Sequence, residues 1–376
     1  MKQKIGISCY PTVGGSGVVA TELGKLLAEK GHEIHFISTS MPFRLNKTYP
    51  NIYYHEVEVS QFEVFQYPPY SLTLASKMAE VIEREQLDVL HVHYAVPHAV
   101  CALLAKDMVE RDIKVVTTLH GTDITVLGHD SSLKPIIKYA IERSDKVTAV
   151  SQALASQTKE SLHITRPIET IYNFIDERVY KPQIMKNELK HAYHIQEHEK
   201  IVVHISNFRP VKRVVDVVEA FHVLHEHTPS KLLMIGDGPD RNKAYRHAVQ
   251  RGISEDVLFL GSQKNIVDFL NIADIMFLLS EKESFGLAAL EAMACGVPVI
   301  GTDTGGIPEV IVNNETGYTC PVGDAEEAGL KALHLLQHPL LYEAFSSAGK
   351  ARVEEVFASS LIVEYYESIY HEVSLT

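Results

Sequence analysis

Two glutamates, Glu283 and Glu291, stand eight positions apart in a segment that follows a short apolar run. The run, Ile275–Leu279, is typical of a buried strand, and the residues after it predict a strand-to-helix turn. We expect Ser284 to cap the helix, with Phe285 in its first turn, and Gly296 to end it. Both carboxylates are thereby predicted to lie on one short element beside the end of a strand.

The spacing of the two glutamates limits the chemistry that they could do. Eight helical positions span about 12 Å, which is too far for a shared proton or for joint action on one reacting atom. The spacing suits two groups that hold opposite ends of a long ligand, with the helix N-terminus facing an anion between them. A sugar nucleotide has this form. Solvated glutamates on a helix surface can have the same spacing, so the interpretation depends on the rest of the chain.

A cluster of cations follows another predicted strand. Arg209, Lys212 and Arg213 lie in the segment after Ile201–Ile205, in a chain whose net charge is −13. A departing nucleoside diphosphate gains negative charge, and cations held beside it stabilise the transition state. The alternative is a solvated run of surface charge.

Two further segments that could bind a ligand lie at strand ends in the first half of the chain. Gly14–Gly17 follows the first predicted strand and opens a helix, so its backbone amides could approach a phosphate or a carboxylate. The GxGxxG spacing is absent and no acidic residue ends the second strand, which argues against a nicotinamide cofactor. His120, followed by Gly121, ends another strand and is placed to reach a ligand. A structural histidine or a tight turn is the alternative in each case.

Strands alternate with helices along both halves of the chain, which predicts an α/β protein with two doubly wound, Rossmann-like domains facing across a cleft. The predicted strands are Ile5–Cys9, Ile34–Ile37, Leu87–His93, Ile113–Thr118, Lys146–Val150, Ile168–Tyr172, Ile201–Ile205, Leu232–Ile235, Val257–Leu260, Ile275–Leu279 and Val297–Ile300. We place the domain boundary at residues 165/166, in a crossing segment that extends to about Lys200. Residues 359–373 predict a terminal helix with Leu361, Tyr365, Ile369 and Val373 on one face.

Composition excludes several classes of protein. A chain of 376 residues with 45% hydrophobic and 22% charged residues is typical of a globular protein of two domains. Its acidic balance argues against nucleic-acid and membrane partners. Four dispersed cysteines without a CxxC pair, and the absence of a signal-like or membrane-spanning run, predict a cytoplasmic protein. We expect no metal site, because His91 and His93 alternate along a strand without a third ligand nearby in sequence.

Taken together, these segments resemble a known family. Glu283 and Glu291 within ESFGLAALEAMACGVPVI, with the cation cluster and GDGP before them and GTDTGGIPEV after them, are similar to the signature of retaining GT-B glycosyltransferases of family four. Stretches over nearly the whole chain, such as HVHYAVPHAVCA and TTLHGTDITVLG, resemble one narrower group within it. That group transfers N-acetylglucosamine (GlcNAc) from UDP-GlcNAc to the hydroxyl of L-malate, with release of UDP, in bacillithiol biosynthesis.

The resemblance implies a division of labour between the domains. Residues 1–165 would bind the acceptor, with a C-terminal helix of about residues 359–376 crossing back onto them, and residues 166–358 would bind the nucleotide sugar. The implied substrates are UDP-GlcNAc and L-malate, with no metal or other cofactor. The oligomeric state is left open, and a homodimer is one option.

The resemblance also implies roles for single residues. Glu291 would hold the ribose hydroxyls and Glu283 the hydroxyls of the sugar, while Arg209 and Lys212 would neutralise the diphosphate. His120 would contact the sugar near the reacting carbon. The remaining expected contacts to the nucleotide sugar are Gly15, Asn207, Phe285, Gly286 and Leu287, and those to malate are Ser16, Tyr94 and Thr118.

One position departs from the family pattern. Asn207 stands where many members carry arginine, so the paired cation would come from Arg209 or Arg213.

The implied reaction is α-retaining, with a phosphate oxygen taking the proton of the attacking hydroxyl, so that neither glutamate is expected to be a general base. Three other functions remain open: transfer to another acceptor such as an inositol phosphate or a lipid, sugar binding without catalysis, and epimerisation of a UDP-sugar.

Overall fold

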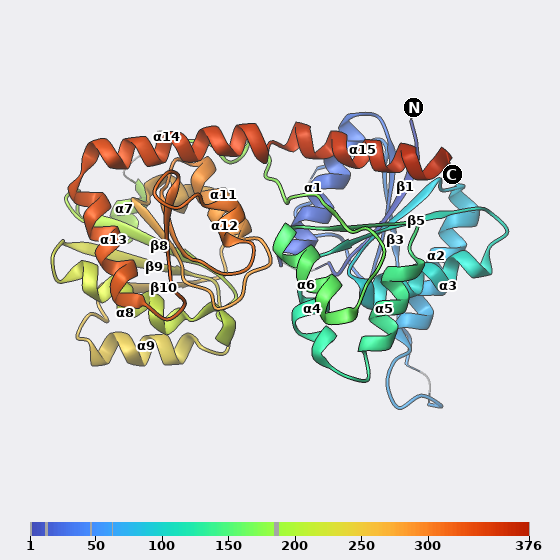
Figure 1. Cartoon of the computed structure of the whole chain (residues 1–376), viewed down its shortest axis with the longest axis horizontal. Coiled ribbons are helices and arrows are strands. Elements are labelled where there is room, and N and C mark those ends of the chain that lie inside the picture. Colours follow the sequence, from blue (N-terminus) through green and yellow to red (C-terminus); the bar gives the residue numbers. More distant parts are fainter. Residues whose placement is uncertain (1, 12–13, 46, 62, 184–187, 376) are drawn as a thin grey trace. The chain divides into compact units, whose positions relative to one another are not determined.

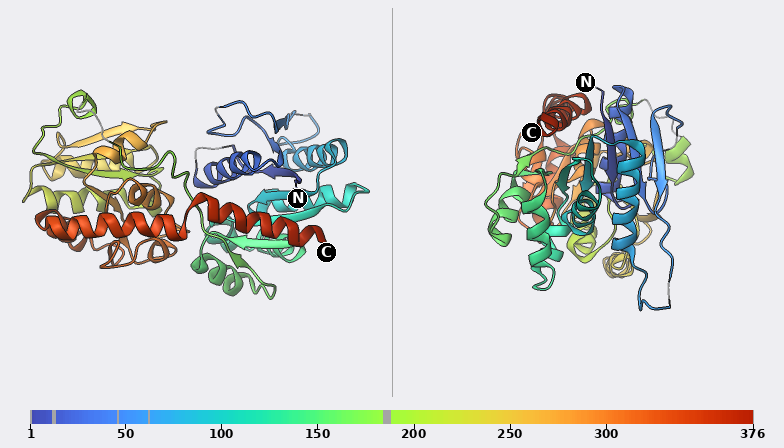
Figure 2. Two further views of the ribbon diagram at one scale, coloured as in Figure 1. Left: turned by 90° about the horizontal axis from the view of Figure 1, so that it is seen from above. Right: turned by 90° about the vertical axis from the view of Figure 1, so that its right-hand side faces the viewer.

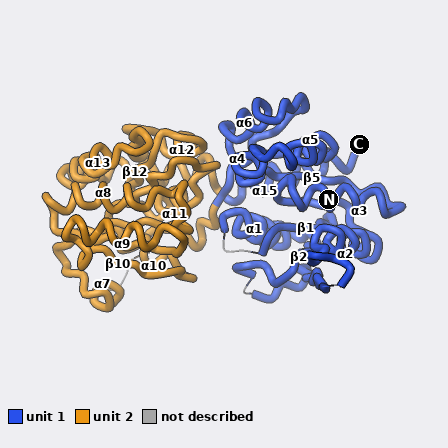
Figure 3. The backbone as a smooth tube through the Cα atoms, turned by 90° about the horizontal axis from the view of Figure 1, so that it is seen from below, with its two compact units in different colours: residues 1–174, 359–376 blue, residues 175–358 orange. Residues whose placement is uncertain are grey.

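The computed structural model describes residues 2–11, 14–45, 47–61, 63–183 and 188–375 of the chain. They form two compact units (Figure 3). Each unit is built around one parallel sheet. Unit 1 comprises Met1–Phe174 together with Ser359–Thr376, and unit 2 comprises Ile175–Ala358. The alternation of strand and helix in the sequence therefore gives the expected fold class in both units.

Unit 1 contains a seven-stranded sheet of order β3-β2-β1-β4-β5-β6-β7 (Figure 1). Its strands are β1 Lys4–Ser8, β2 Glu33–Ser38, β3 Ile52–Glu56, β4 Val89–His93, β5 Lys114–Leu119, β6 Lys146–Ala149 and β7 Glu169–Thr170. Its helices are α1 Gly15–Glu29, α2 Tyr70–Glu85, α3 Val100–Met108, α4 Thr122–Thr125, α5 Lys134–Arg143, α6 Gln152–Leu162 and α15 Ser359–Leu375, with short turns η1 Ala95–Ala99 and η2 Leu127–His129.

Unit 2 contains a six-stranded sheet of order β10-β9-β8-β11-β12-β13. Its strands are β8 Lys200–Ile205, β9 Ser230–Ile235, β10 Val257–Gly261, β11 Ile275–Leu278, β12 Val299–Thr302 and β13 Gly317–Cys320. Its helices are α7 Glu188–Ala192, α8 Val214–His225, α9 Arg241–Gln250, α10 Val267–Ile272, α11 Leu287–Ala294, α12 Ile307–Val310, α13 Ala325–Gln337 and α14 Pro339–Val356, with one short turn, η3 Pro210–Lys212.

Strand order reverses once in each sheet. In unit 1 the chain runs outward from β1 through β2 to β3, then returns to the other side of β1 with β4. In unit 2 it runs from β8 to β10 and returns beside β8 with β11. Ligands of doubly wound sheets bind outside the carboxyl ends of the strands at such a reversal. The ends of β1, β4 and β5, and of β8 and β11, are therefore where a site is expected.

The unit boundary lies after Phe174 and not after Thr165. The difference arises because β7, at Glu169–Thr170, pairs with β6 and so belongs to the sheet of unit 1. The chain re-enters unit 1 at Ser359, as expected, where α15 begins.

The C-terminal helix covers unit 1 with a face that matches the predicted one only in part, because Ile369 and Val373 are buried as expected but Tyr365 is not. In α15 the buried side chains include Ile362, Tyr366, Ile369 and Tyr370, whereas Tyr365 is 51% exposed. The helix lies along unit 1 near α1 and β5 (Figure 2). The tyrosines turn inward because their hydroxyls find polar partners on the sheet, which the apolar periodicity alone did not reveal.

Two strands were missed by the sequence prediction, and both lie at sheet edges. The side chains of β3 are half-buried or exposed, and β13 is only four residues long. The strand β3 carries a weak apolar pattern because it is only partly covered, whereas β13 is mostly buried but its sequence, GYTC, is not an apolar run.

Candidate functional site

In unit 2, a lysine and a glutamate meet at the carboxyl ends of β8 and β11. Lys212 ends the short turn η3 and its Nζ lies 2.5 Å from Oε2 of Glu283, in the loop after β11. Ser280 donates its hydroxyl to the same carboxylate oxygen over 3.1 Å. Both side chains of the pair remain partly accessible, at 18% and 17%. The strand reversal thus brings together two predicted site residues from segments that are 71 positions apart.

The structure corrects the predicted helix around Glu283. Helix α11 begins at Leu287, and its N-cap position is Gly286, which has φ of +101°. Ser284 does not cap the helix, because the left-handed turn at Gly286 separates it from the first helical residue. Glu283 therefore lies in the loop and Glu291 on the helix, so the 12 Å helical spacing does not describe their separation. Glu291 is 4% exposed within α11.

Glycines after β12 let a second loop press against the backbone of Glu283. A Cβ atom at Gly305 would lie 2.0 Å from the carbonyl oxygen of Glu283, and one at Gly306 would lie 2.4 Å from that of Ser284. The Gly306 amide donates to the Glu283 carbonyl over 2.9 Å. The TGGIPE segment thus positions the loop that carries Glu283, a function that its turn chemistry alone did not reveal.

Two sets of contacts order the segment after β8 that carries the cations. His204 donates Nδ1–H to the carbonyl of Phe277 over 2.9 Å, so its Nε2 accepts the hydroxyl proton of Ser206 over 2.8 Å. A Cβ atom at Gly238 of the GDGP turn would lie 2.0 Å from the carbonyl of Asn207. The GDGP turn after β9 therefore fixes the start of this segment.

The cations after β8 have different surroundings. Arg213 pairs with Asp216 over 2.6 Å and lies 3.9 Å from Glu281. Asn207 and Arg209 are exposed. Lys212 is thus held against Glu283 and Arg213 against Asp216, while Arg209 is on the surface. That Arg209 or Arg213 supplies the cation that the family carries at the position of Asn207 stays a prediction.

In unit 1, hydroxyl groups meet at the ends of β1 and β4. Helix α1 begins at Gly15, so the glycine turn is itself the first helical turn, and Gly14 is its N-cap. The Ser16 hydroxyl lies 2.6 Å from the hydroxyl of Tyr94, the residue after β4. Tyr94 has φ of +83° and burial raises the pKa of its phenol, so it stays neutral near pH 7. Two predicted acceptor ligands therefore contact each other.

The predicted histidine lies beside this pair. Nε2 of His120 is 2.7 Å from Nδ1 of His93, and its ring centroid is 5.4 Å from that of Tyr94. Burial, with a smaller effect of His98, lowers the pKa of His120 to about 3. The imidazole is therefore neutral near pH 7, so that it donates a hydrogen bond at one ring nitrogen and accepts one at the other.

The third predicted acceptor ligand lies deeper in unit 1. Thr118 is fully buried in β5, and its hydroxyl lies 2.7 Å from His91 Nε2, 2.8 Å from Thr148 Oγ1 and 3.3 Å from the hydroxyl of Tyr366. These partners tie β4, β5 and β6 to α15. A contact between Thr118 and malate stays a prediction.

Asp123, which the sequence prediction passed over, connects the turns that carry two of the predicted site residues. Its carboxylate accepts the backbone amides of Ala95 and Gly121, each over 3.0 Å, and so joins the turns after β4 and β5. Burial raises the pKa of Asp123 to about 6, against the lowering effect of these amides. Its place directly after His120-Gly121-Thr122 could have drawn attention to it. Its burial depends on contacts that the spacing of residues in the sequence does not reveal.

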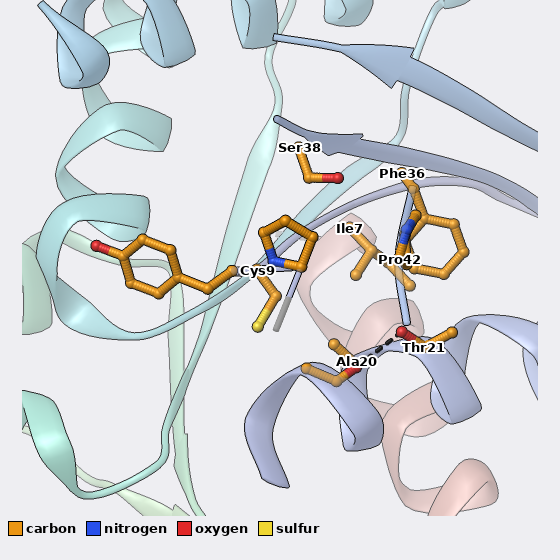
Figure 4. Close-up of a pocket in the computed structure, with 10 residues that line it drawn as sticks. Ile7, Cys9, Ala20, Thr21, Phe36, Ser38 and Pro42 are labelled. Atoms are coloured by element: carbon orange, nitrogen blue, oxygen red, sulfur yellow. Dashed lines mark hydrogen bonds between the residues drawn. The ribbon is translucent and has the colours of Figure 1, made fainter. Parts of the chain in front are cut away.

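A small pocket opens beside the glycine turn of unit 1 (Figure 4). Apolar groups form most of its wall, including Ile7, Phe36 and Pro42, with the thiol of Cys9. Burial raises the pKa of the Cys9 thiol to about 12, so the sulfur is a protonated core group and not a nucleophile. All four cysteines are unpaired and buried.

Within the described residues, one group has the geometry of a cation site. It lies at the edge of the sheet of unit 1 that is formed by β2 and β3. Ligand atoms of His35, His55 and Glu85 lie within 4.8 Å of one another. The arginine Arg84 donates to Glu85 over 2.7 Å and lies 2.9 Å from His55 Nδ1, so a cationic group already occupies these surroundings. The arrangement is accounted for by hydrogen bonds, and the expectation that no metal takes part in the reaction stays a prediction.

The helices of the described chain include none that is both long and apolar enough to cross a membrane.

Both units match known glycosyltransferases. Residues 185–352 match the family described as Glycosyl transferases group 1, and residues 13–179 match Glycosyltransferase Family 4. A glycosyltransferase from Rickettsia africae has the same fold, with a TM-score of 0.83 at 23% identity, covering 99% of this chain and 98% of that one. The Anabaena protein HepE in complex with UDP-glucose gives 0.83 at 18% identity, covering 98% and 100%. The fold and the matches define a glycosyltransferase of the GT-B class.

A narrower relationship comes from sequence. N-acetyl-α-D-glucosaminyl L-malate synthase from Bacillus anthracis is 58% identical over 373 residues, which cover 99% of this chain and 98% of the relative. The chain belongs to the family of this synthase.

Proposed function

We propose that the protein is a retaining glycosyltransferase that moves GlcNAc from UDP-GlcNAc to the hydroxyl of L-malate, giving GlcNAc-malate and UDP, as the first step of bacillithiol biosynthesis. The observation that carries the choice of substrates is the 58% identity to the malate synthase over 99% of the chain. The polar groups at the strand reversal of each unit support the chemistry.

Unit 2 has the groups that a nucleotide sugar requires. The amides at the start of α11 and the ammonium of Lys212 favour a diphosphate, since both place positive charge beside it. The Glu283 carboxylate is a strong acceptor for sugar hydroxyls, and Glu291 is proposed to hold the ribose. Further ligands proposed for the nucleotide sugar are Gly15, Asn207, Arg209, Phe285, Gly286 and Leu287.

Unit 1 has polar groups suited to a small hydroxy acid. Ser16 and Tyr94 present hydroxyls at the start of α1, where the helix dipole favours a carboxylate. We propose that the malate hydroxyl attacks the anomeric carbon on the face from which the diphosphate leaves. A phosphate oxygen takes the proton, because the neighbouring neutral His120 is a weak base.

The cytoplasm is the proposed compartment. The four unpaired, buried cysteines support it, since thiols persist in a reducing environment.

One assay separates this function from the alternatives. UDP release from UDP-GlcNAc is measured with L-malate, with D-malate and without acceptor, and the anomeric configuration of the product is read by NMR. We expect UDP release to require L-malate and the product to be the α-anomer. UDP release without acceptor, conversion of UDP-GlcNAc to another UDP-sugar, or an inverted product would contradict the proposal.

A further inference from the structure

The contact between His93 and His120 limits which ring nitrogens of the two imidazoles can carry a proton. His93 ends β4 and is paired in register with Thr118 of β5, and His120 follows two residues later. Side chains two residues apart point to the same face of a sheet, so both rings lie on one face. Nδ1 of His93 and Nε2 of His120 are 2.7 Å apart, which is a short hydrogen bond between two imidazoles.

The other nitrogen of His93 has no partner. His93 is fully buried, and its Nε2 makes no hydrogen bond to any residue that the structure describes. Burial, with smaller effects of His91, His120 and His98, lowers the pKa of His93 well below its ordinary value. The ring is therefore neutral and carries one proton, either on Nδ1 or on the unpartnered Nε2.

The two arrangements differ in what is left buried. With the proton on Nε2, His93 would bury an N–H group without an acceptor, and its Nδ1 would accept a hydrogen bond from Nε2–H of His120. With the proton on Nδ1, His93 donates to His120 and leaves only a lone pair unpartnered. Orphaned buried N–H groups are rare because they lose their hydrogen bond to water without replacement. The second arrangement is therefore the stable one.

We propose that His93 is a positioning residue that donates Nδ1–H to Nε2 of His120, so that His120 carries its own proton on Nδ1 and offers substrate a hydrogen-bond donor. His120 itself is partly accessible, which leaves its second nitrogen open to a ligand. This inference rests on the proposed function only in naming the substrate. An oxygen of the sugar or of malate would accept from Nδ1–H, and His120 would have no free lone pair with which to act as a base.

The tautomers can be read directly in the free protein. Nitrogen-15 NMR of the imidazole rings, with histidine labelled and signals assigned by single substitutions, distinguishes a protonated from a bare ring nitrogen. We expect bare Nε2 and protonated Nδ1 in both His93 and His120. A protonated Nε2 in either ring overturns the proposal. This result does not depend on whether the protein transfers GlcNAc.

Two substitutions at His93 test the consequence for turnover. In His93→Asn the amide nitrogen can take the place of Nδ1, whereas in His93→Gln the amide lies one bond further along the side chain. We expect His93→Asn to keep transfer within about threefold of the wild type, and His93→Gln to lower kcat by about 100-fold, as for loss of a preorganised donor. The KM for UDP-GlcNAc should change little.

The outcomes are distinguishable from a failure to fold and from a failure of the proposed function. Equal activity of the two variants contradicts the positioning role. If His93→Gln is unfolded by circular dichroism, the NMR result on the wild type still decides. If the wild type does not release UDP with L-malate, the proposed function fails while the tautomer assignment stands or falls on the NMR alone.

Discussion

The ammonium of Lys212 is paired with the carboxylate of Glu283. A bound diphosphate would compete with that carboxylate for the ammonium. Lys212 Nζ lies 2.5 Å from the Glu283 carboxylate. A diphosphate offers stronger negative charge, so binding would move the ammonium toward it and free Glu283 for the sugar. If the proposed function holds, Glu283 opposes binding of the nucleotide and supports transfer of the sugar.

The substitution Glu283→Gln tests this competition. We expect UDP to bind about threefold to tenfold more tightly, because Lys212 loses its anionic partner, and transfer to slow by about 100-fold, because an amide is a weaker acceptor than a carboxylate. Calorimetry with UDP and the rate of UDP release measure the two effects. Glu327→Gln, which breaks the Lys331–Glu327 pair on α13, is the control and should leave both unchanged. Normal transfer by Glu283→Gln would exclude the assigned role.

The raised pKa of the buried Asp123 carboxyl leads us to expect that the stability of unit 1 depends on pH. The folded pKa of this carboxyl, about 6, lies above its ordinary value of 3.8, so the folded state holds the proton more tightly than the unfolded state does. The stabilisation is fully present below pH 4 and is lost as the pH rises through 6. We expect the wild type to be more stable than Asp123→Asn by a margin that shrinks from pH 4 to pH 7. Urea unfolding at several pH values measures it, and a margin independent of pH would contradict the prediction.

Sequence reasoning selected residues whose chemistry is visible in a motif, and passed over residues whose contacts depend on strand pairing. Glu283 and Lys212 were predicted from charge and placement. His93 was seen only as one of two alternating histidines, since its contact with His120 requires the register of β4 against β5. Asp123 was missed because spacing does not show that a carboxylate is buried.

At the scale of elements, the strand-to-helix loop of unit 2 is shaped by glycines on another loop. The start of α11 was misplaced because the left-handed conformation of Gly286 could not be distinguished from helix in the sequence. Central strands were predicted well, since they are continuous apolar runs. The edge strands β3 and β13 were missed because neither sequence, IYYHE or GYTC, is a continuous apolar run.

The substitution Gly306→Ala tests the close approach of the two loops. Its Cβ would lie 2.4 Å from the Ser284 carbonyl and 2.7 Å from Phe285 Cα, which are backbone atoms that cannot rotate away. We expect a loss of about 1–3 kcal/mol in the free energy of unfolding and at least about tenfold slower transfer. Gly349→Ala on α14 is the control, because its nearest contact would be 3.7 Å and alanine favours helix. Similar behaviour of the two variants would exclude a steric role for Gly306.

At the scale of the whole molecule, unit 1 is assembled from both ends of the sequence. Tyr370 of α15 contacts His91 through its hydroxyl over 2.7 Å, across 279 positions of sequence. The prediction of a C-terminal helix belonging to unit 1 came from family resemblance, since nothing in the periodicity of residues 359–373 names the surface that they cover.

The substitution Tyr370→Phe measures what this long-range contact contributes. We expect it to cost about 1–3 kcal/mol, because a buried imidazole nitrogen loses its partner. Tyr365→Phe on the same helix is the matched control and should change stability by less than about 0.5 kcal/mol, since Tyr365 is 51% exposed. Thermal unfolding followed by circular dichroism compares the two. Equal losses would show that the helix contributes through its apolar face alone.

The order of synthesis gives this discontinuity a further consequence. A ribosome makes residues 1–174 first, but the helix that covers His91 and Thr118 emerges only after all of unit 2. Unit 2 is contiguous in sequence and can complete its core while unit 1 still exposes buried polar groups and apolar side chains of its sheet. The half-finished unit is then the species that a chaperone would bind and that would aggregate when translation stalls before Ser359.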